Sequence, residues 1–524
     1  MGTDAPTVPL EGLMMRTPLL IRSIAERAGQ LFADREVVSV TANGIERSTY
    51  GEVLDRARRL AGALHAMGIR PGDRVATFGW NSRRHLELYL AVPSMGAVLH
   101  TLNIRLFEDD LRYIVGHAAD RVIFLDASLA EQMPHFDGVE REVLMPDADA
   151  TRQGALDYEE LIAGGNPDFQ FPDIDEHAAA AMCYTSGTTG LPKGVVYSQR
   201  STVLHTLLTN LADGPGLRAR DTVMPIVPMF HANAWGLPYA AAMAGSKLVL
   251  PGPKMDPASL ASLIAAERIT FAAAVPTIWQ GIAQLPETPD LSSVERLVCG
   301  GSAVPEGLMR TYDTRFGVPI IQAWGMTETS PMASISRVPP GIEDEDEAYA
   351  MRATQGRVMP LVEFRIDEES GGELQVRGPT IASSYYEDES SAGKFTDDGW
   401  LRTGDVAELH SDGATIKLVD RTKDLVKSGG EWISSVELEN VIMGHPEVLE
   451  AAVVAVADER WGERPCACVV REDGSTLDGD GLRAFLAPKV AKWWLPERVE
   501  FIDEVPKTSV GKFDKKVLRA RLAP

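Results

Sequence analysis

Helical and strand patterns alternate in the first part of the chain, and this alternation constrains the fold more than any other feature. Apolar residues recur at helical spacing over residues 54–67, and Gly68 follows as a C-terminal cap. The strands and helices predicted next lie in turn at 74–78, 82–95, 97–102, 107–117 and 121–126. Because strands that alternate with helices form βαβ units, we expect a largely parallel sheet.

Later segments repeat this pattern and then depart from it, as expected for a chain too long for one hydrophobic core. Further strands are predicted at 247–250, 270–275, 296–299 and 319–322, which indicates a second α/β subdomain. Polar and apolar residues alternate over 363–377 around Gly371 and Gly372, which predicts an antiparallel hairpin in a β-rich unit. Beyond Asp420, helices at 436–443 and 480–490 and a strand at 451–457 predict a separate small domain.

Charge and cysteine content exclude some classes of protein. The formal charge of −24 argues against nucleic-acid binding and against docking on an anionic membrane. The four cysteines lie mostly in apolar surroundings, which favours reduced thiols and a cytoplasmic location. We find no signal peptide and no apolar run of the roughly 18 residues that a membrane span needs, so we expect no stable membrane insertion.

Residues 184–195 combine four Ser/Thr hydroxyls, three glycines and Lys193 in a short loop after an apolar stretch. Hydroxyls and backbone N–H groups donate to phosphate oxygens, and glycine lets the backbone approach them closely. The loop is not a Walker motif, because Lys193 lies between Pro192 and Gly194. We interpret it as a phosphate cradle; the simpler alternative is a flexible surface loop.

Four further segments carry residues suited to nucleotide chemistry, although each has a structural alternative. In the run 322–329, Trp324 can stack on a purine, Thr327 can donate to a phosphate, and Glu328 offers a hard oxygen to Mg²⁺. A second segment is 228–236 with its histidine, which alone could be core packing. In the pair 403–405 and 420–421, the Asp405 carboxylate could accept from both hydroxyls of a ribose and Arg421 could donate to the same sugar, although Gly-Asp alone is an ordinary turn. The segment 505–512 ends in a glycine and a lysine, which alone would be a surface charge.

In this order, the motifs resemble the signatures of the acyl-adenylate-forming enzymes, which include acyl-CoA synthetases, peptide-synthetase adenylation domains and luciferases. The resemblance covers residues 24–522. It implies an α/β fold with a large N-terminal domain at 1–419, made of two α/β subdomains and a β-rich subdomain. A hinge at 420–424 and a small mobile α+β domain at 425–524 follow. The family more often has tyrosine where this chain has Trp324, but tryptophan can also stack.

The resemblance assigns roles to individual residues. It implies catalytic roles for Lys512, Glu328, Thr185 and His231, with Mg²⁺ held by Thr185 and Glu328. It places His231, Trp235, Gly301 and Gly325 at the acyl pocket, and Gly429 and Gly430 at the coenzyme A channel. The implied ATP contacts are Thr185, Ser186, Gly187, Thr188, Thr189, Gly190, Lys193, Gly301, Ser302, Gln322, Ala323, Trp324, Gly325, Thr327, Asp405, Arg421, Lys423, Lys427 and Trp432.

The implied reaction is that of an ATP-dependent acid–CoA ligase. A carboxylate attacks the α-phosphate of ATP, diphosphate leaves, and the thiol of coenzyme A then displaces AMP from the acyl-adenylate. The run 427–435 together with Trp324 resembles fatty acyl-CoA synthetases for medium and long chains, and methylthiopropionate–CoA ligases. The acid itself, short to medium or longer in chain, is not determined by the sequence.

Two alternatives remain open at this point. The adenylate could pass its acyl group to an amine, a carrier protein or oxygen, or the chain could be a nucleotide-binding regulator without turnover. The segment before Ile24 could be the arm of a homodimer, as the resemblance allows, or a tail.

Overall fold

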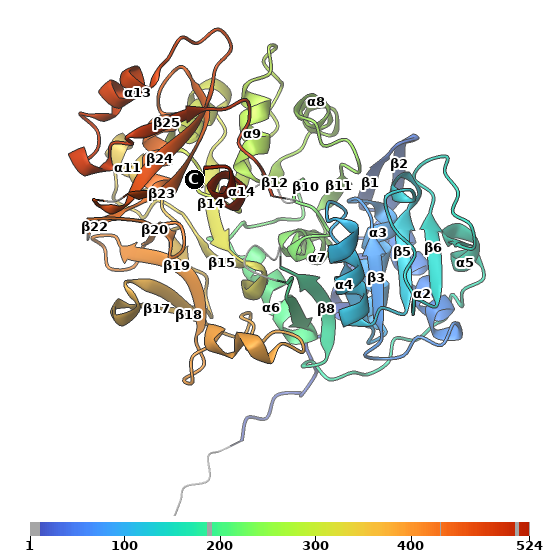
Figure 1. Ribbon diagram of the computed structural model, residues 1–524. Helices are drawn as coiled ribbons and strands as arrows, with labels where there is room; N and C mark the ends of the chain where they lie inside the picture. The colour runs from blue at the N-terminus through green and yellow to red at the C-terminus, as the bar shows by residue number, and fades with distance from the viewer. Residues whose placement is uncertain (1–10, 186–190, 430, 459, 509–512, 523–524) are drawn as a thin grey trace, which may run out of the picture.

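The computed structural model describes residues 11–185, 191–429, 431–458, 460–508 and 513–522. Figure 1 shows the first α/β sheet on the right in blue and cyan and the C-terminal region at the upper left in orange and red. Within the described residues, none of the helices has the length and apolar character needed to cross a bilayer.

The first sheet has seven strands in the order β7-β6-β5-β3-β4-β8-β9. Its pairs are parallel except β8 with β9, which are antiparallel. The predicted alternation is confirmed: α2 (Tyr50–Ala66) begins at a Thr49–Glu52 capping box, and α3 and α4 follow their strands. The strands are β3 (Arg74–Phe78), β4 (Val98–Thr101), β5 (Val122–Asp126), β6 (Arg141–Met145), β7 (Leu156–Asp157), β8 (Ala179–Tyr184) and β9 (Gly194–Ser198).

The second sheet has nine strands in the order β16-β15-β14-β13-β12-β10-β11-β1-β2. The four predicted strands are confirmed as β11 (Lys247–Leu250), β12 (Phe271–Ala274), β13 (Arg296–Gly300) and β14 (Ile320–Gly325). The hairpin of β1 (Glu36–Thr41) and β2 (Gly44–Thr49), from near the N-terminus, joins the far edge of this sheet through parallel pairing of β1 with β11. The remaining strands are β10 (Thr222–Pro225), β15 (Met332–Ile335) and β16 (Arg357–Val358).

Helices cover both sheets and share a core with them. One continuous cluster of buried side chains joins the two sheets through α1, α2, α3 and α7, and includes Tyr50, Tyr89 and Tyr239. The helices are α1 (Ile21–Leu31), α3 (Arg83–Ser94), α4 (Glu108–Ala118), α5 (Tyr158–Ala163), α6 (Gln199–Thr209), α7 (Leu237–Ala244), α8 (Pro257–Glu267), α9 (Pro276–Ala283), α10 (Glu306–Thr311) and α11 (Glu345–Arg352).

A four-stranded antiparallel sheet follows, in orange at the lower left of Figure 1. The predicted hairpin is confirmed, because Ile366 pairs with Leu374 across β17 (Glu363–Asp367) and β18 (Glu373–Arg377). The sheet is completed by β19 (Leu401–Leu409) and β20 (Ile416–Arg421), in which Asp405 lies opposite Arg421.

The C-terminal region has its own sheet and its own buried clusters, which pack around Val453 and Cys466. The helix predicted over 480–490 ends earlier, at Leu486, and the predicted strand extends in both directions. The elements are β21 (Val426–Ser428), β22 (Glu431–Ile433), α12 (Ser435–Met443), β23 (Val448–Asp458), β24 (Gly462–Arg471), α13 (Gly479–Leu486), β25 (Arg498–Phe501) and α14 (Lys515–Leu522).

Candidate active site

The described ends of the glycine-hydroxyl loop lie where β8 ends and β9 begins, and β9 contacts the Glu328 motif that follows β14. The hydroxyl of Tyr197, on β9, donates to the Thr327 carbonyl at 2.7 Å and joins the two motifs. At the mouth of the loop, the Thr185 N–H donates to the Lys193 carbonyl at 2.9 Å, and the Lys193 N–H donates to Thr185 Oγ1 at 3.2 Å. Of the predicted ATP contacts, Ser186, Gly187, Thr188, Thr189 and Gly190 lie outside the described residues.

Glu328 lies in a short 3-10 turn (Thr327–Thr329) and is buried. Its carboxylate accepts a hydrogen bond from the Tyr385 hydroxyl, and its carbonyl accepts from the Ala382 N–H at 2.8 Å. Mg²⁺ prefers hard oxygen ligands and is commonly held by one or two carboxylates together with substrate phosphates. The Glu328 carboxylate and the Thr185 hydroxyl are donors of that kind, and no cluster of three acidic, His or Cys ligands occurs in the described residues. The donor set therefore fits Mg²⁺ shared with a triphosphate.

Trp324, Asp405 and Arg421 form one connected group. The Trp324 indole N–H donates to Asp405 Oδ2 at 3.0 Å, and Arg421 Nε lies 2.6 Å from Asp405 Oδ1. Asp405 is almost fully buried, whereas Arg421 is partly exposed. The residues predicted for the adenine and the ribose are thus adjacent, and both carboxylate oxygens of Asp405 already have donors.

Gln322, a predicted ATP contact, has its side chain fully committed to the protein. Its Oε1 accepts from the Val304 N–H at 2.7 Å, and its Nε2 donates to the carbonyls of Ala353 and Thr354. The amide is buried and holds β14 against two loops. The backbone carbonyl of Gln322 also accepts from the Ser336 N–H at 2.8 Å, so the polar groups of Gln322 serve mainly the fold around β14.

A narrow apolar pocket of about 40 Å³ lies behind β14 and is lined by Trp235, Gly300, Ala323, Trp324 and Gly325, among others. A Cβ on Gly300 would lie 2.6 Å from the Ala323 carbonyl oxygen and 3.3 Å from the Trp235 ring, so only glycine fits there. The predicted acyl residues Trp235 and Gly325 thus share one pocket. In place of Gly301 the pocket is lined by Gly300, and His231 instead lines a separate small cavity with Thr185 and Phe230.

Trp235 belongs to a backbone turn that is unusual for residues with side chains. Residues 232–235 all have positive φ, between 41° and 55°, a region that L-residues other than glycine seldom adopt. The Cys183 thiol donates to Asn233 Oδ1 at 2.9 Å, and the His205 ring packs where a Cβ of Gly236 would lie. Burial lowers the pKa of His205 to about 4, so this ring is neutral at pH 7.

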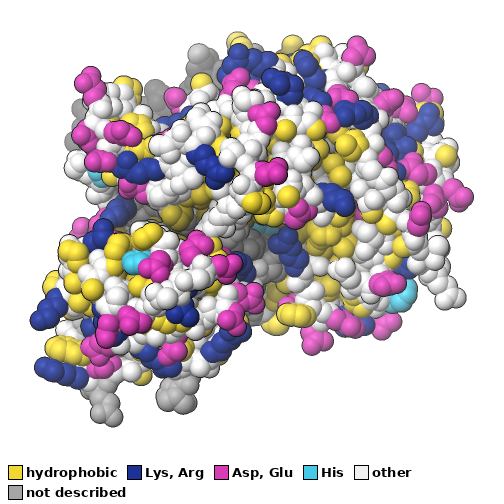
Figure 2. Space-filling model, turned by 90° about the horizontal axis from the view of Figure 1, so that it is seen from above, with side chains coloured by type: hydrophobic (Ala, Val, Ile, Leu, Met, Phe, Trp, Pro, Cys, Tyr) yellow, Lys and Arg dark blue, Asp and Glu magenta, His cyan; other side chains and the backbone are white. Residues whose placement is uncertain are grey.

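A cleft of about 210 Å³ separates the C-terminal region from the second sheet. Figure 2 shows a deep groove that sets a smaller lobe apart from the rest of the molecule. Ser302, Arg421 and Lys423 line one part of the cleft, and Thr508 and Phe513 line another. Lys512 lies outside the described residues, but the residues on either side of its segment face this cleft.

Hydrogen bonds and ion pairs cross the predicted hinge. The Ser435 N–H and hydroxyl both donate to the Asp420 carboxylate, and the Lys515 ammonium donates to the Ser435 hydroxyl at 2.7 Å. Lys515 also lies 2.6 Å from Glu439, whose pKa is raised to about 7 because it is buried. Desolvation likewise raises the pKa of Asp420 and lowers that of Lys423. These contacts tie α12 and α14 to the end of β20.

Lys427 and Trp432 are not among the residues that line the cleft. The Lys427 ammonium lies 5.2 Å from the centre of the Trp432 ring, which is largely exposed on the β21–β22 hairpin. Gly429 has a φ of 61°, and its N–H donates to the Trp461 carbonyl at 2.8 Å. A Cβ on Gly429 would lie 2.8 Å from the Trp461 ring, and Gly430 lies outside the described residues.

Two family models match this chain. The model described as "AMP-binding enzyme" matches residues 25–386, and the one described as "AMP-binding enzyme C-terminal domain" matches residues 437–512. The chain belongs to the AMP-binding enzyme family.

The similarity to other AMP-binding enzymes extends over nearly the whole chain. The medium-chain-fatty-acid–CoA ligase of Ectopseudomonas oleovorans is 44% identical over 97% of each chain. The 3-methylmercaptopropionyl-CoA ligase of Ruegeria pomeroyi is 44% identical over 97% of this chain and 98% of its own. The ATP-bound structure of MatB from Rhodopseudomonas palustris has a TM-score of 0.81 and 27% identity, covering 95% of this chain and 98% of its own. The α/β architecture and the adenylate-forming resemblance are thereby confirmed.

Sequence reasoning missed one segment of this AMP-binding enzyme, residues 382–395, which closes over Glu328 and Lys193. The Lys193 ammonium donates to the Ser391 hydroxyl, lies 3.6 Å from Asp388, and lies 5.2 Å from the centre of the Tyr385 ring. The Tyr386 N–H donates to the Gly194 carbonyl at 2.8 Å. Its residue types are those of any polar surface loop, so no local signal distinguished it.

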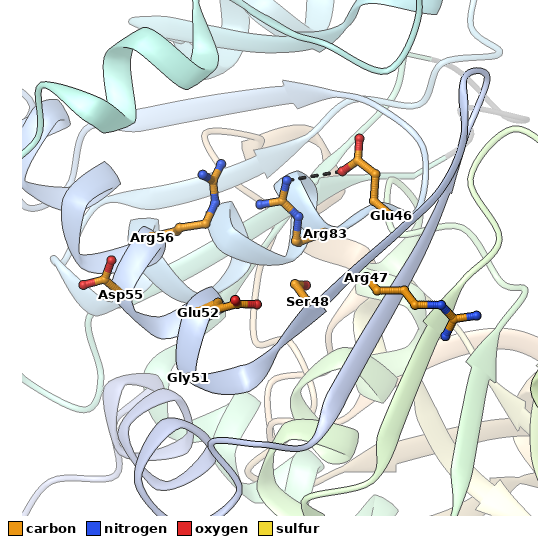
Figure 3. A pocket seen from close by; sticks show the side chains of 8 residues that line it. All are labelled: Glu46, Arg47, Ser48, Gly51, Glu52, Asp55, Arg56 and Arg83. Atoms are coloured by element: carbon orange, nitrogen blue, oxygen red, sulfur yellow. Dashed lines mark hydrogen bonds and ion pairs between the residues drawn. The ribbon is translucent and has the colours of Figure 1, made fainter.

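A larger open hollow of about 720 Å³ lies on β2, α2 and α3, in a different part of the molecule (Figure 3). Its guanidinium groups are already paired with carboxylates: Arg83 with Glu46, Arg56 with Glu87, and Arg47 with Glu267. Because these charges are satisfied within the protein, we interpret this hollow as a structural charge network.

Proposed function

We propose that this chain is an ATP-dependent acid–CoA ligase that activates a medium-chain carboxylic acid. The reaction joins the acid and coenzyme A through an acyl-adenylate and releases AMP and diphosphate. The single observation that carries the proposal is the position of Trp324: its ring lines the apolar pocket, while its N–H holds Asp405. An acyl chain and a ribose bound on either side of Trp324 would meet at the α-phosphate.

The first step must join two anions, so neutralisation of charge matters more than proton transfer. Lys193, Arg421, Lys423 and Lys427 are the described cations among the predicted ATP contacts, and we assign Lys512 as a further one. Mg²⁺ bound by Glu328 and Thr185 would neutralise phosphate charge when present. The partly buried Trp235 and the buried Gly300 line the acyl end of the pocket with apolar groups.

The second step requires a thiol to reach the carbonyl of the adenylate. We assign Gly429 and Gly430 to the pantetheine channel and residues 420–424 to the hinge that brings this channel into place. Lys427 and Trp432, which do not line the cleft here, would reach the nucleotide only in another orientation of the C-terminal domain. The domain boundaries at 419 and 425 are part of this proposal.

The proposed substrate follows from the relatives and from the apolar pocket. Relatives with equal identity are named for medium-chain fatty acids and for 3-methylmercaptopropionate. The pocket of about 40 Å³ is lined by Trp235 among others, and we propose that a chain of several carbons displaces this ring. We place the enzyme in the cytoplasm, in keeping with its four buried, unpaired cysteines, and propose a homodimer through the N-terminal segment.

The decisive experiment measures diphosphate release with acids from acetate to palmitate, 3-methylthiopropionate and aromatic acids, with and without coenzyme A. Mass spectrometry of the products identifies acyl-CoA, acyl-AMP or an amide. We expect the highest kcat/KM with a medium-chain acid and an acyl-CoA product. ATP binding without release of diphosphate for any acid would instead indicate a nucleotide-binding regulator, and an amide product would indicate a different acceptor.

A further inference from the structure

Lys394 ends a short 3-10 helix (Glu389–Lys394) in the segment that closes over Glu328 and Lys193. Its ammonium lies against the backbone of β19 at Gly404: a Cβ built on Gly404 would be 3.5 Å from Nζ. Glu328, Glu373 and Asp405 all attract this ammonium electrostatically. Within the described part of the chain, however, no hydrogen bond or ion pair of the Lys394 ammonium is formed.

The position of Lys394 is held from both sides. Toward the N-terminus, Tyr385 donates to Glu328, and Lys193 donates to Ser391. Toward the C-terminus, Phe395 bridges to Leu401 and packs edge-on against the Tyr385 ring, with centroids 5.6 Å apart. A cation on an anchored segment keeps its place without a partner, unlike a lysine on a free surface loop.

Removing an ammonium partly from water without a partner costs free energy, unless a bound ligand supplies the missing partner. Burial is the largest influence on Lys394 and lowers its pKa, with Glu328 acting in the opposite direction. Two carboxylates act on this ammonium: Asp405, which is predicted for the ribose and follows Gly404, and Glu328, which is predicted for the metal. In a nucleotide bound across these two, the 5′-phosphate lies between the sugar and the metal end.

We infer that Lys394 binds the 5′-phosphate of the nucleotide, the α-phosphate at which the acid is adenylated. This inference deepens the proposed function and rests on it. Lys394 would then be a further phosphate-binding cation in the N-terminal domain, in addition to Lys193 and to Lys512 of the C-terminal segment. Because Lys394 does not belong to the C-terminal domain, it would hold the phosphate in both half-reactions.

Calorimetry of AMP and adenosine binding to the whole protein tests the inference, because the two ligands differ only in the phosphate. Lys394→Met should weaken AMP binding about 10- to 100-fold, the range for a charge-assisted hydrogen bond, and leave adenosine binding unchanged. Lys394→Arg should retain most of the AMP affinity. Lys417→Met is the matched control, because Lys417 is a half-exposed lysine on β20 in the sheet that carries Asp405. This variant should bind both AMP and adenosine with normal affinity.

Three results would overturn the inference, and they differ from one another. Normal AMP binding by Lys394→Met would exclude the contact. Equal loss of AMP and adenosine binding would show that Lys394 only supports the fold of the site. Failure of the unaltered protein to bind AMP, together with no acid-dependent release of diphosphate, would reject the proposed function itself. Thermal unfolding without ligand checks that the variant is folded; we expect no loss of stability, since the ammonium makes no ion pair.

Discussion

The indole N–H of Trp324 donates to Asp405 at 3.0 Å, so a residue on one sheet holds a carboxylate on another sheet. Trp324 lies one residue before the end of β14 in the nine-stranded sheet, and Asp405 belongs to β19 of the four-stranded sheet. A tyrosine at this position would offer an O–H at a different point of the ring. The tryptophan would therefore combine the predicted stacking surface for the base with a donor to Asp405, the carboxylate predicted to bind the ribose.

Trp324→Phe keeps an aromatic ring but removes this donor. We expect the KM for ATP in diphosphate release to rise about tenfold, because a hydrogen bond to a charged group is worth about 1.5–3 kcal/mol and Asp405 would keep only Arg421. The effect should appear for AMP and adenosine alike, since the ribose is common to both. An unchanged affinity for adenosine would show that the Trp324–Asp405 contact does not prepare the ribose site.

Trp235→Ala should extend the predicted acyl pocket, since Trp235 lines this pocket and its ring approaches Gly300. We expect kcat/KM to shift toward longer acids, by about 1–3 kcal/mol for each methylene that the larger pocket accepts. Adenylation of a series of straight-chain acids measures the shift. An identical chain-length profile in the variant would place the acyl chain elsewhere.

Lys512→Ala separates the two half-reactions. The lysine should act only while the carboxylate attacks ATP, so diphosphate release should be abolished, whereas thioester formation from preformed acyl-AMP should remain near normal. Each half-reaction is measured alone, the second with synthetic acyl-AMP and coenzyme A. Equal loss in both would contradict a role confined to adenylation.

Lys423→Pro tests the predicted hinge, because proline fixes φ. The structure holds the C-terminal domain through Asp420, Ser435 and Lys515, and a fixed backbone at residue 423 should favour one orientation. We expect thioester formation to slow more than adenylation in single-turnover measurements. Normal rates for both would show that rotation at residue 423 is unimportant.

Acid should destabilise this protein partly through His205. Its pKa in the folded state, about 4, is below the ordinary value of 6.5, so between these pH values the unfolded chain binds a proton that the native state does not. The free energy of unfolding therefore falls as pH decreases from 6.5 to 4, by on the order of 3 kcal/mol for this ring. His205→Gln should flatten that part of the curve in denaturant unfolding; His85, also with a pKa near 4, remains as a further contribution.

The local elements of the fold could be predicted from periodicity alone. The apolar spacing over 54–67 predicted α2, and the apolar runs predicted β3, β11 and β14, because each pattern depends only on neighbours along the chain. The antiparallel hairpin around Gly371 and Gly372 follows from the same local rule. The pairing of β1 with β11 was not predicted, since it joins segments about 200 residues apart with no local signal.

The same division applies to the site. The sequence by itself determined which chemistry is present, because hydroxyls, glycines, carboxylates and lysines have that chemistry in any fold. Only the tertiary structure decided which groups meet. It shows that the Gln322 side chain is hydrogen-bonded within the protein, and that Gly300 and not Gly301 lines the pocket. It also shows that residues 382–395 bring Lys394 toward Asp405. These outcomes depend on contacts between distant segments, whose packing energies are set by the assembled core and not by any stretch of neighbouring residues.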